Sequence, residues 1–294
     1  MATKGIVMIA GGHWKYGEMA SILAMGIKLY SSIPIALFID GRGGTHLTEF
    51  QKGLFTIHEL PEFMYNHNKV ESFYRVKTFL PELSPFDETV FLDVDMIWSP
   101  GRKAEDLFLD CNFSMINEGY IDFKTLENTI SKNYHFWSQP HDIKDAYEIK
   151  DSKLYQYRSE YIYFKKCKEV EKYFSLVRKI YDNPQMKSLK FGEVLPDEIA
   201  FDIASAQMKF YPHKDNWSPT YWHYLYSFLR LEPKDIYEKY FAYSMGGKIV
   251  TQVQRDFYNA LYKFYYSQYG LQFDAVMKWE DKINFAKHHQ TVLK

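Results

Sequence analysis

The sequence predicts an α/β fold in which a mostly parallel central sheet is flanked by helices. Apolar runs alternate with helical patterns over roughly the first 120 residues, which is typical of parallel strands joined by helices. The chain has 294 residues, of which 46% are hydrophobic, enough for one large domain or two small ones. Because no repeat, low-complexity segment or linker divides the chain, we expect a single domain.

Five apolar runs predict the strands of the first half. The first ends at Gly11-Gly12 and the second at Asp40-Gly41. In chain order, the predicted strands span residues 5–10, 33–40, 53–60, 88–95 and 112–117. Apolar residues at helical spacing predict helices at 19–30 and at 70–83, the second interrupted by prolines.

The second half is less regular. Residues 155–164 predict another strand, followed by a helix to residue 181, and residues 120–150 predict loops and short helices. Pro196 and the acids after it predict a helix at 196–207, because proline and acids favour a helix N-terminus. We expect a main domain over residues 1–250 and a helical extension over 251–294.

The aromatic extension is expected to pack on the domain or at a homodimer interface, with a membrane surface as the alternative. No apolar run approaches the roughly 18 residues of a membrane span, so none is predicted. The formal net charge of -1 argues against a nucleic-acid-coating protein or a polybasic anchor. Cys111 and Cys167 have no zinc-site spacing, and their scarcity favours a reduced, cytoplasmic chain.

The candidate binding residues follow the predicted strands, where ligands of such sheets bind. Gly11 and Gly12 could let a diphosphate or ribose approach the backbone, or they could form a simple turn. Asp40 could hold a base or ribose, and a turn is an equal alternative.

Asp93 and Asp95 follow an apolar run and are separated by one residue. In a strand they would face the same side, with Cα atoms roughly 7 Å apart. Carboxylate oxygens with open positions suit Mn²⁺ or Mg²⁺ that bridges substrate phosphates. The alternative is an ordinary solvated strand end, which is common for an isolated pair of this kind.

The segment from Ser72 to Trp98 resembles the donor-site region of retaining GT-A glycosyltransferases of the glycogenin and lipopolysaccharide galactosyltransferase group. That group carries an aromatic-x-Arg-x-Lys helix, a short acidic turn and a strand ending in Leu-Asp-x-Asp. The matching positions here are Phe73, Arg75, Lys77, Asp87, Leu92, Asp93 and Asp95. The resemblance extends over residues 5–250 and is strong over 72–98.

The resemblance also implies roles for residues elsewhere in the chain. Tyr16, with Gly11 and Gly12 before it, would contact the base of the donor, and Arg75 or Lys77 would aid the donor. Because Arg75 and Lys77 do not share a helix face, we favour Arg75, whose planar guanidinium suits phosphate. Asp197 and Glu198 would face the transferred sugar or the acceptor, although they could simply favour the helix N-terminus.

The chain departs from the family pattern in two places. Tyr243 stands where the family has a third metal ligand, a histidine, so His213 or His223 are the other candidates for that role. Arg158-Ser159-Glu160 stands where the family has Asn-Ser-Gly, which leaves the donor sugar open.

The resemblance implies a transferase that uses Mn²⁺ or Mg²⁺ to move a sugar from a nucleoside-diphosphate sugar, with UDP favoured, to a hydroxyl with retention of configuration. If configuration inverts instead, Asp197 or Glu198 is the candidate general base. Glycans, lipids, proteins and a hydroxylated DNA base all remain as acceptors. The alternative functions are nucleotidyl transfer and non-catalytic binding of a nucleotide-sugar.

Overall fold

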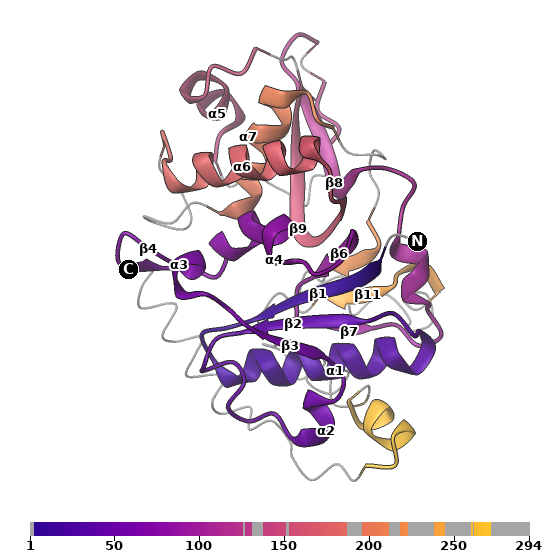
Figure 1. The fold of residues 1–294 in the computed structure, drawn as a ribbon. Helices are drawn as coiled ribbons and strands as arrows, with labels where there is room; N and C mark the ends of the chain where they lie inside the picture. Colours follow the sequence, from indigo (N-terminus) through magenta and orange to yellow (C-terminus); the bar gives the residue numbers. More distant parts are fainter. Residues whose placement is uncertain are drawn as a thin grey trace.

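The computed structural model describes residues 3–125, 127–130, 138–150, 153–186, 196–211, 218–222, 238–244, 260 and 262–271. A six-stranded sheet forms its centre (Figure 1). In spatial order the strands are β3 (Thr56–Glu59), β2 (Ile35–Ile39), β1 (Lys4–Ala10), β6 (Glu88–Leu92), β9 (Lys153–Lys165) and β8 (Phe113–Asp122). Only β9 runs opposite to the other five, so the sheet is mostly parallel, as the sequence predicts.

Helices cover both faces of the sheet, and the sheet lies between two hydrophobic cores (Figure 1). On one face lies α1 (Trp14–Tyr30), in which a β-carbon on Gly26 would overlap Trp98. On the other face lie α6 (Lys168–Asp182) and α7 (Asp197–Met208). The short helix α4 (Leu80–Leu83) lies on this face as well. The shorter helices are α2 (Glu49–Lys52), α3 (Glu62–Tyr65), α5 (Pro140–Ala146) and the 3-10 turns η1 (Arg75–Phe79) and η2 (Ala104–Leu107).

A second, three-stranded sheet lies against α1. Its strands are β10 (Thr220–Trp222), β11 (Ala242–Ser244) and β7 (Met96–Trp98), in that order. In this sheet β11 is antiparallel to β7, so that Tyr243 faces Ile97 across the pair. The chain that leaves the central sheet after β6 therefore enters this smaller sheet within three residues, and those residues are Asp93 to Asp95.

All six predicted strands are present in the central sheet, and the predicted helix at 196–207 is α7. The predicted helix at 19–30 begins five residues earlier, at Trp14, because the imidazole of His13 accepts a hydrogen bond from the amide of Lys15 and caps its start. The predicted strand at 88–95 ends at Leu92, so the two acids lie in a bend rather than on a strand.

The prediction of a single helix over residues 70–83 is wrong. Val70–Glu71 forms β5, which pairs with β4 (Asn66–His67) in a hairpin whose turn residues Asn68 and Lys69 have positive φ angles of 52° and 65°. Helical structure begins only at Arg75, and Pro81 occupies the first turn of α4, where its missing amide costs no hydrogen bond. The helical spacing of this stretch therefore reflects a 3-10 turn followed by a short helix.

Part of the expected C-terminal extension is described, as helical residues 262–268 and the turn after them. The phenol of Tyr262 donates to Glu18 at 3.0 Å, and that of Tyr269 donates to the carbonyl of Met25 at 3.0 Å. Tyr265 is fully buried and donates to the carbonyl of Trp98. This segment packs on α1, and the rest of 251–294 lies outside the described residues except for residue 260.

Within the described part of the chain, no helix combines the length and apolar character that crossing a bilayer requires. Cys111 and Cys167, both within the described residues, do not form a disulfide.

Candidate active site

Three loops meet where β1, β2 and β6 end, because parallel strands present their carboxyl ends at one edge of the sheet. The loop after β1 carries Gly11 and Gly12, the loop after β2 starts at Asp40, and the bend after β6 holds Asp93 and Asp95. The amide of Gly12 donates to Asp40 at 3.2 Å, which links the first two loops directly. The convergence of these residues at one edge follows the sequence-based prediction.

Asp93 lies at the centre of a buried charge cluster. Its amide donates to the carbonyl of Glu160 at 2.9 Å, which holds the bend against β9. The ammonium of Lys77 lies 2.9 Å from each oxygen of the Asp93 carboxylate. Lys77 also donates to the hydroxyl of Ser159 at 3.0 Å and lies 3.5 Å from the carboxylate of Asp197. Four elements distant in sequence thus contribute to one cluster.

The electrostatics of the cluster depend on its burial. Burial raises the pKa of Asp93 to about 7, opposed by Lys77 and reinforced by Asp95. Burial alone would lower the pKa of Lys77, but the charges of Asp197 and Asp93 outweigh it and raise the pKa. Lys77 therefore stays charged, while the two half-buried acids after β6 repel each other.

Two side chains from the first turn of α1 lie within electrostatic reach of these acids. The ammonium of Lys15 lies 4.7 Å from the centre of the Tyr16 ring, and Lys15 is only 3% exposed. Burial lowers the pKa of Lys15 to about 8, against the opposing effect of Asp95. Burial raises the pKa of Tyr16, followed by the charge of Asp95. Tyr16 thus lies near the acid pair, and Lys15 is a residue that the sequence-based prediction missed.

The loop packing fixes where the first turn of α1 sits. A β-carbon on Gly17 would overlap the carbonyl of Gly43, so α1 approaches the 40–45 loop closely through a position without a side chain.

A bulge in β9 brings Ser159 to the cluster. Met115 pairs with Ile162, but the next residue of β8 pairs with Arg158, so residues 159–161 have no partner on β8. On α7, the carboxyl of Asp202 accepts a hydrogen bond from the amide of Tyr157 at 2.9 Å and holds the backbone beside the bulge. The sequence singles out the segment that contains Ser159 without giving this residue a role, because a bulge leaves no local signature in the sequence, and it does not single out Asp202.

The position where the family has Asn-Ser-Gly carries buried charges here. The guanidinium of Arg158 lies 2.6 Å from Glu118 and 3.3 Å from Glu160. The hydroxyl of Thr220 donates to Glu160 at 2.6 Å, which ties β9 to β10. Desolvation raises the pKa of Glu118.

Arg75 does not reach the acids after β6. Its guanidinium donates to both oxygens of Asp182 on α6, at 2.6 and 2.9 Å, and to the carbonyl of Phe63 at 2.5 Å. Of the two basic residues in this turn, the structure brings Lys77 to Asp93 and points Arg75 the other way. Lys77, rather than the favoured Arg75, is therefore the one of the two that contacts Asp93, and a role of either residue toward the donor stays a prediction.

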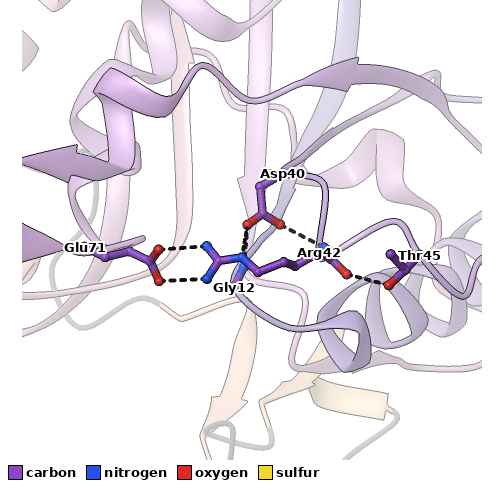
Figure 2. A network of polar contacts seen from close by, with 6 residues as sticks. Gly12, Asp40, Arg42, Thr45 and Glu71 are labelled. Atoms are coloured by element: carbon purple, nitrogen blue, oxygen red, sulfur yellow. Dashed lines mark hydrogen bonds and ion pairs between the residues drawn. The ribbon is translucent and has the colours of Figure 1, made fainter.

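Asp40 has a full set of contacts within the protein (Figure 2). Its carboxylate accepts hydrogen bonds from the amides of Gly12 and Gly43, at 3.2 and 2.8 Å, and from Arg42 at 2.7 Å. Figure 2 also shows Arg42 reaching across to Glu71 through two contacts of 3.2 and 2.8 Å. Asp40 therefore joins the loops after β1 and β2 to the β4–β5 hairpin.

The two glycines after β1 meet Phe73. A β-carbon on Gly11 would overlap the Phe73 ring, which stacks on Tyr65 with ring centres 4.8 Å apart. Gly12 has a φ angle of +80°, which favours glycine. The glycine pair is thus explained in part by the packing of Phe73.

Asp197 and Glu198 begin α7 at the edge of the cluster. Asp197 is buried and faces Lys77, whereas Glu198 is half-buried. Partial burial and the charge of Asp197 raise the pKa of Tyr74, which is 47% exposed, so Tyr74 is a further neighbour that the sequence-based prediction did not assign.

One property of the carboxylates at this edge favours binding of a hard divalent ion. Asp93 and Asp95 are neighbouring half-buried acids whose charges repel each other, and a cation relieves such repulsion. Among the described residues, however, no group of three or more His, Cys, Asp and Glu side chains is placed to hold a metal. Tyr243 is buried on β11, and His213 and His223 lie outside the described residues. An ion held by these two acids would therefore need its other ligands from substrate and water.

No protein-family model and no curated protein matches the chain. Solved structures do match it. The galactosyltransferase LgtC, determined in complex with donor and acceptor sugar analogues, matches with a TM-score of 0.52 and 12% identity over 95% of this chain and 99% of LgtC. The bifunctional glycosyltransferase WbbM matches with a TM-score of 0.51 and 11% identity. That match covers 84% of this chain, which spans only 46% of the WbbM chain. The likeness confirms at the level of the fold that this chain shares the GT-A architecture of these glycosyltransferases.

Proposed function

We propose that this protein is a glycosyltransferase that moves a sugar from a nucleoside-diphosphate sugar, with UDP favoured, to a hydroxyl acceptor. The observation that carries the proposal is the meeting of Asp93, Lys77 and Asp197, from three distant segments, at the carboxyl edge of a GT-A sheet. The likeness to LgtC, which was determined with donor and acceptor sugar analogues, supports this substrate class.

Asp93 and Asp95 would hold Mn²⁺ or Mg²⁺ in this proposal. A bound divalent ion stabilises the charge that develops on the leaving diphosphate. Tyr16, beside the acids, would contact the donor base. Lys77 keeps Asp93 and Asp197 in fixed positions and remains charged, so it adds positive potential where the diphosphate would lie.

Retention of configuration fits the proposed reaction. The bond between the anomeric carbon and the diphosphate oxygen breaks, and the acceptor oxygen bonds to that carbon on the same face. The acceptor proton passes to the leaving diphosphate, so no protein base is required. Asp197 is buried on Lys77, which suits orientation of the transferred sugar, and the half-buried Glu198 is the candidate base if the reaction inverts.

Binding of nucleotides tests the proposal first. UDP, GDP, CMP and ADP are screened by thermal shift, each with and without Mn²⁺, because a ligand of the native state raises stability by roughly 2.7 kcal/mol at a hundredfold excess over Kd. A shift with one nucleotide supports the proposal and identifies the donor class. The absence of a shift with every pair contradicts it.

A non-catalytic nucleotide-sugar-binding protein is the second candidate. It is favoured by the absence of a third acidic or histidine ligand among the described residues. Release of UDP from a UDP-sugar in the presence of glycan, lipid, protein or hydroxylated-DNA acceptors separates the two functions. Binding without release with any acceptor supports the second.

A further inference from the structure

Lys77 faces more acceptors than its ammonium has donors. An ammonium carries three N–H groups. The nitrogen of Lys77 lies 2.9 Å from both oxygens of Asp93 and donates to the hydroxyl of Ser159 at 3.0 Å, so these contacts engage its donors. The carboxylate of Asp197 lies 3.5 Å away, beyond the usual length of a hydrogen bond. Lys77 is therefore paired with Asp93 and only adjacent to Asp197.

Asp197 has a buried oxygen that this arrangement leaves without a donor. Its side chain is 2% exposed, and its Oδ2 atom, which faces Lys77, accepts no hydrogen bond from any described residue. A buried acceptor without a donor costs free energy, so such an atom needs an explanation. Because charged hydrogen bonds are about 2.7–2.9 Å long, a movement of Lys77 by roughly 1 Å would supply the missing donor.

Asp93 is the member of the cluster that solvent reaches. Its side chain is 29% exposed, whereas those of Lys77 and Asp197 are 8% and 2% exposed. Its amide donates to the carbonyl of Glu160 at 2.9 Å, which holds the backbone of the bend in place. A cation from solvent therefore meets the carboxylate of Asp93 before the two buried side chains behind it.

Lys77 competes with any second cation for the carboxylate of Asp93. Two cations on one carboxylate repel each other, and a partly buried site screens this repulsion only weakly. A divalent ion at Asp93 would also neutralise the charge that attracts the ammonium. Asp197 offers a second carboxylate next to it, and the hydroxyl of Ser159 can keep its bond to Lys77 during so small a movement.

We propose that Lys77 shifts its ion pair from Asp93 to Asp197 when a divalent ion binds at Asp93. This inference rests on the function proposed above, because it concerns the ion of that site. Asp197 is then a positioning residue, which receives the displaced ammonium and strengthens binding of the ion without touching it. The contact between Lys77 and Asp197 and the binding of the ion are thus coupled.

The first test is Asp197→Asn, which keeps the shape of the side chain and removes its charge. Electron paramagnetic resonance measures free Mn²⁺ in a titration without nucleotide. We expect Asp197→Asn to weaken Mn²⁺ binding about tenfold, because a neutral acceptor holds the displaced ammonium less well than a carboxylate. Asp182→Asn is the matched control. It removes the carboxylate that pairs with Arg75, the other basic residue of the same turn, and should leave Mn²⁺ binding unchanged.

The second test repeats the substitution without the lysine. Lys77→Met alone should tighten Mn²⁺ binding, because Asp93 loses the cation that competes for it. Adding Asp197→Asn to Lys77→Met should then have no further effect, since no ammonium remains for Asp197 to receive. An equal weakening by Asp197→Asn with and without Lys77 would show that Asp197 acts on the ion directly, and it would overturn the inference.

Nuclear magnetic resonance gives a readout that does not depend on Lys77→Met being folded. Mg²⁺ should shift the ammonium signal of Lys77 in the wild type and shift it much less in Asp197→Asn, with the signal assigned from its loss in Lys77→Arg. Equal shifts, or unchanged Mn²⁺ binding in Asp197→Asn, overturn the inference. If the wild type binds none of the four nucleotides, the proposed function itself fails. If it binds a nucleotide and Asp197→Asn behaves like the wild type toward Mn²⁺, only the shift of Lys77 fails.

Discussion

Asp40 and Asp93 each come directly after a buried parallel strand, yet the structure uses them in different ways. Asp40 receives two backbone amides and an arginine and is 4% exposed, so its charge is satisfied within the protein. Asp93 meets one lysine and a second acid, and its pKa is raised to about 7. The comparison shows that the number of hydrogen-bond donors around an acid at a strand end decides its role. An acid with several donors, such as Asp40, holds loops together, whereas an acid with few, such as Asp93, can still bind a ligand.

The largest effect of any substitution is expected for Asp95, in the bend after β6. Under the proposed function, Asp95→Ala should lower turnover by about 10²–10³-fold, because it removes charge stabilisation at the diphosphate. Metal-dependent binding of the nucleotide should be lost while the melting temperature stays near that of the wild type. Unchanged affinity for the nucleotide in the presence of Mn²⁺ would contradict the metal assignment.

The matching change on the β2 side should affect the fold instead. Asp40→Ala removes the acceptor for Gly12, Gly43 and Arg42, and hydrogen bonds to a charged group contribute about 1.5–3 kcal/mol each. We expect the free energy of unfolding to fall by about 3 kcal/mol, because the loops relax and part of the loss is recovered. Urea denaturation measures it.

Asp40→Asn is the graded control for that variant, since it keeps one acceptor oxygen. Its stability should lie between that of the wild type and that of Asp40→Ala. A loss of donor affinity in Asp40→Asn without any loss of stability would instead support direct contact of Asp40 with the base or ribose.

A third acid, Asp202, extends the comparison to pH. Burial raises the pKa of Asp202 well above its ordinary value, so the folded chain holds this proton more tightly than the unfolded chain. Its contribution to stability is therefore largest below the unfolded pKa of roughly 4 and falls by about 1.4 kcal/mol for each pH unit above it, until the folded pKa is reached.

Asp202→Asn should remove this dependence, because asparagine does not titrate, while its amide oxygen can still accept from the amide of Tyr157. Urea unfolding at pH 5 and pH 6 compares the two proteins, and the variant should gain stability relative to the wild type as the pH rises between these values. A constant difference would show that Asp202 is ionised in the native state.

The smallest effect is expected at the surface end of the Asp40 network. Arg42 and Glu71 are both about half exposed, and exposed ion pairs contribute about 0.2–1 kcal/mol. A double-mutant cycle with Arg42→Met and Glu71→Gln should give a coupling energy near the upper end of that range at low salt, because the contact is bidentate. A coupling above 2 kcal/mol would mean that the hairpin depends on this pair.

Much of the fold could be predicted from the local pattern of apolar residues along the sequence. The apolar runs and their alternation with helices correctly predicted the central sheet, because burial on both faces requires continuous apolar residues. The sequence also indicated that Gly11, Asp40 and Asp93 would meet, since parallel strands end at one edge. It did not reveal the β4–β5 hairpin, because helical spacing of apolar residues also arises from a turn followed by a short helix.

The partners of each charge were decided only by the tertiary structure. The sequence placed Arg75 and Lys77 two residues apart and could not tell which would face Asp93, because that depends on the position of Asp182 on a helix a hundred residues later. Likewise, Ser159 reaches Lys77 only through a bulge in β9. Hydrophobic periodicity is a local property that sequence determines by itself, whereas the pairing of buried charges depends on distances across the assembled fold.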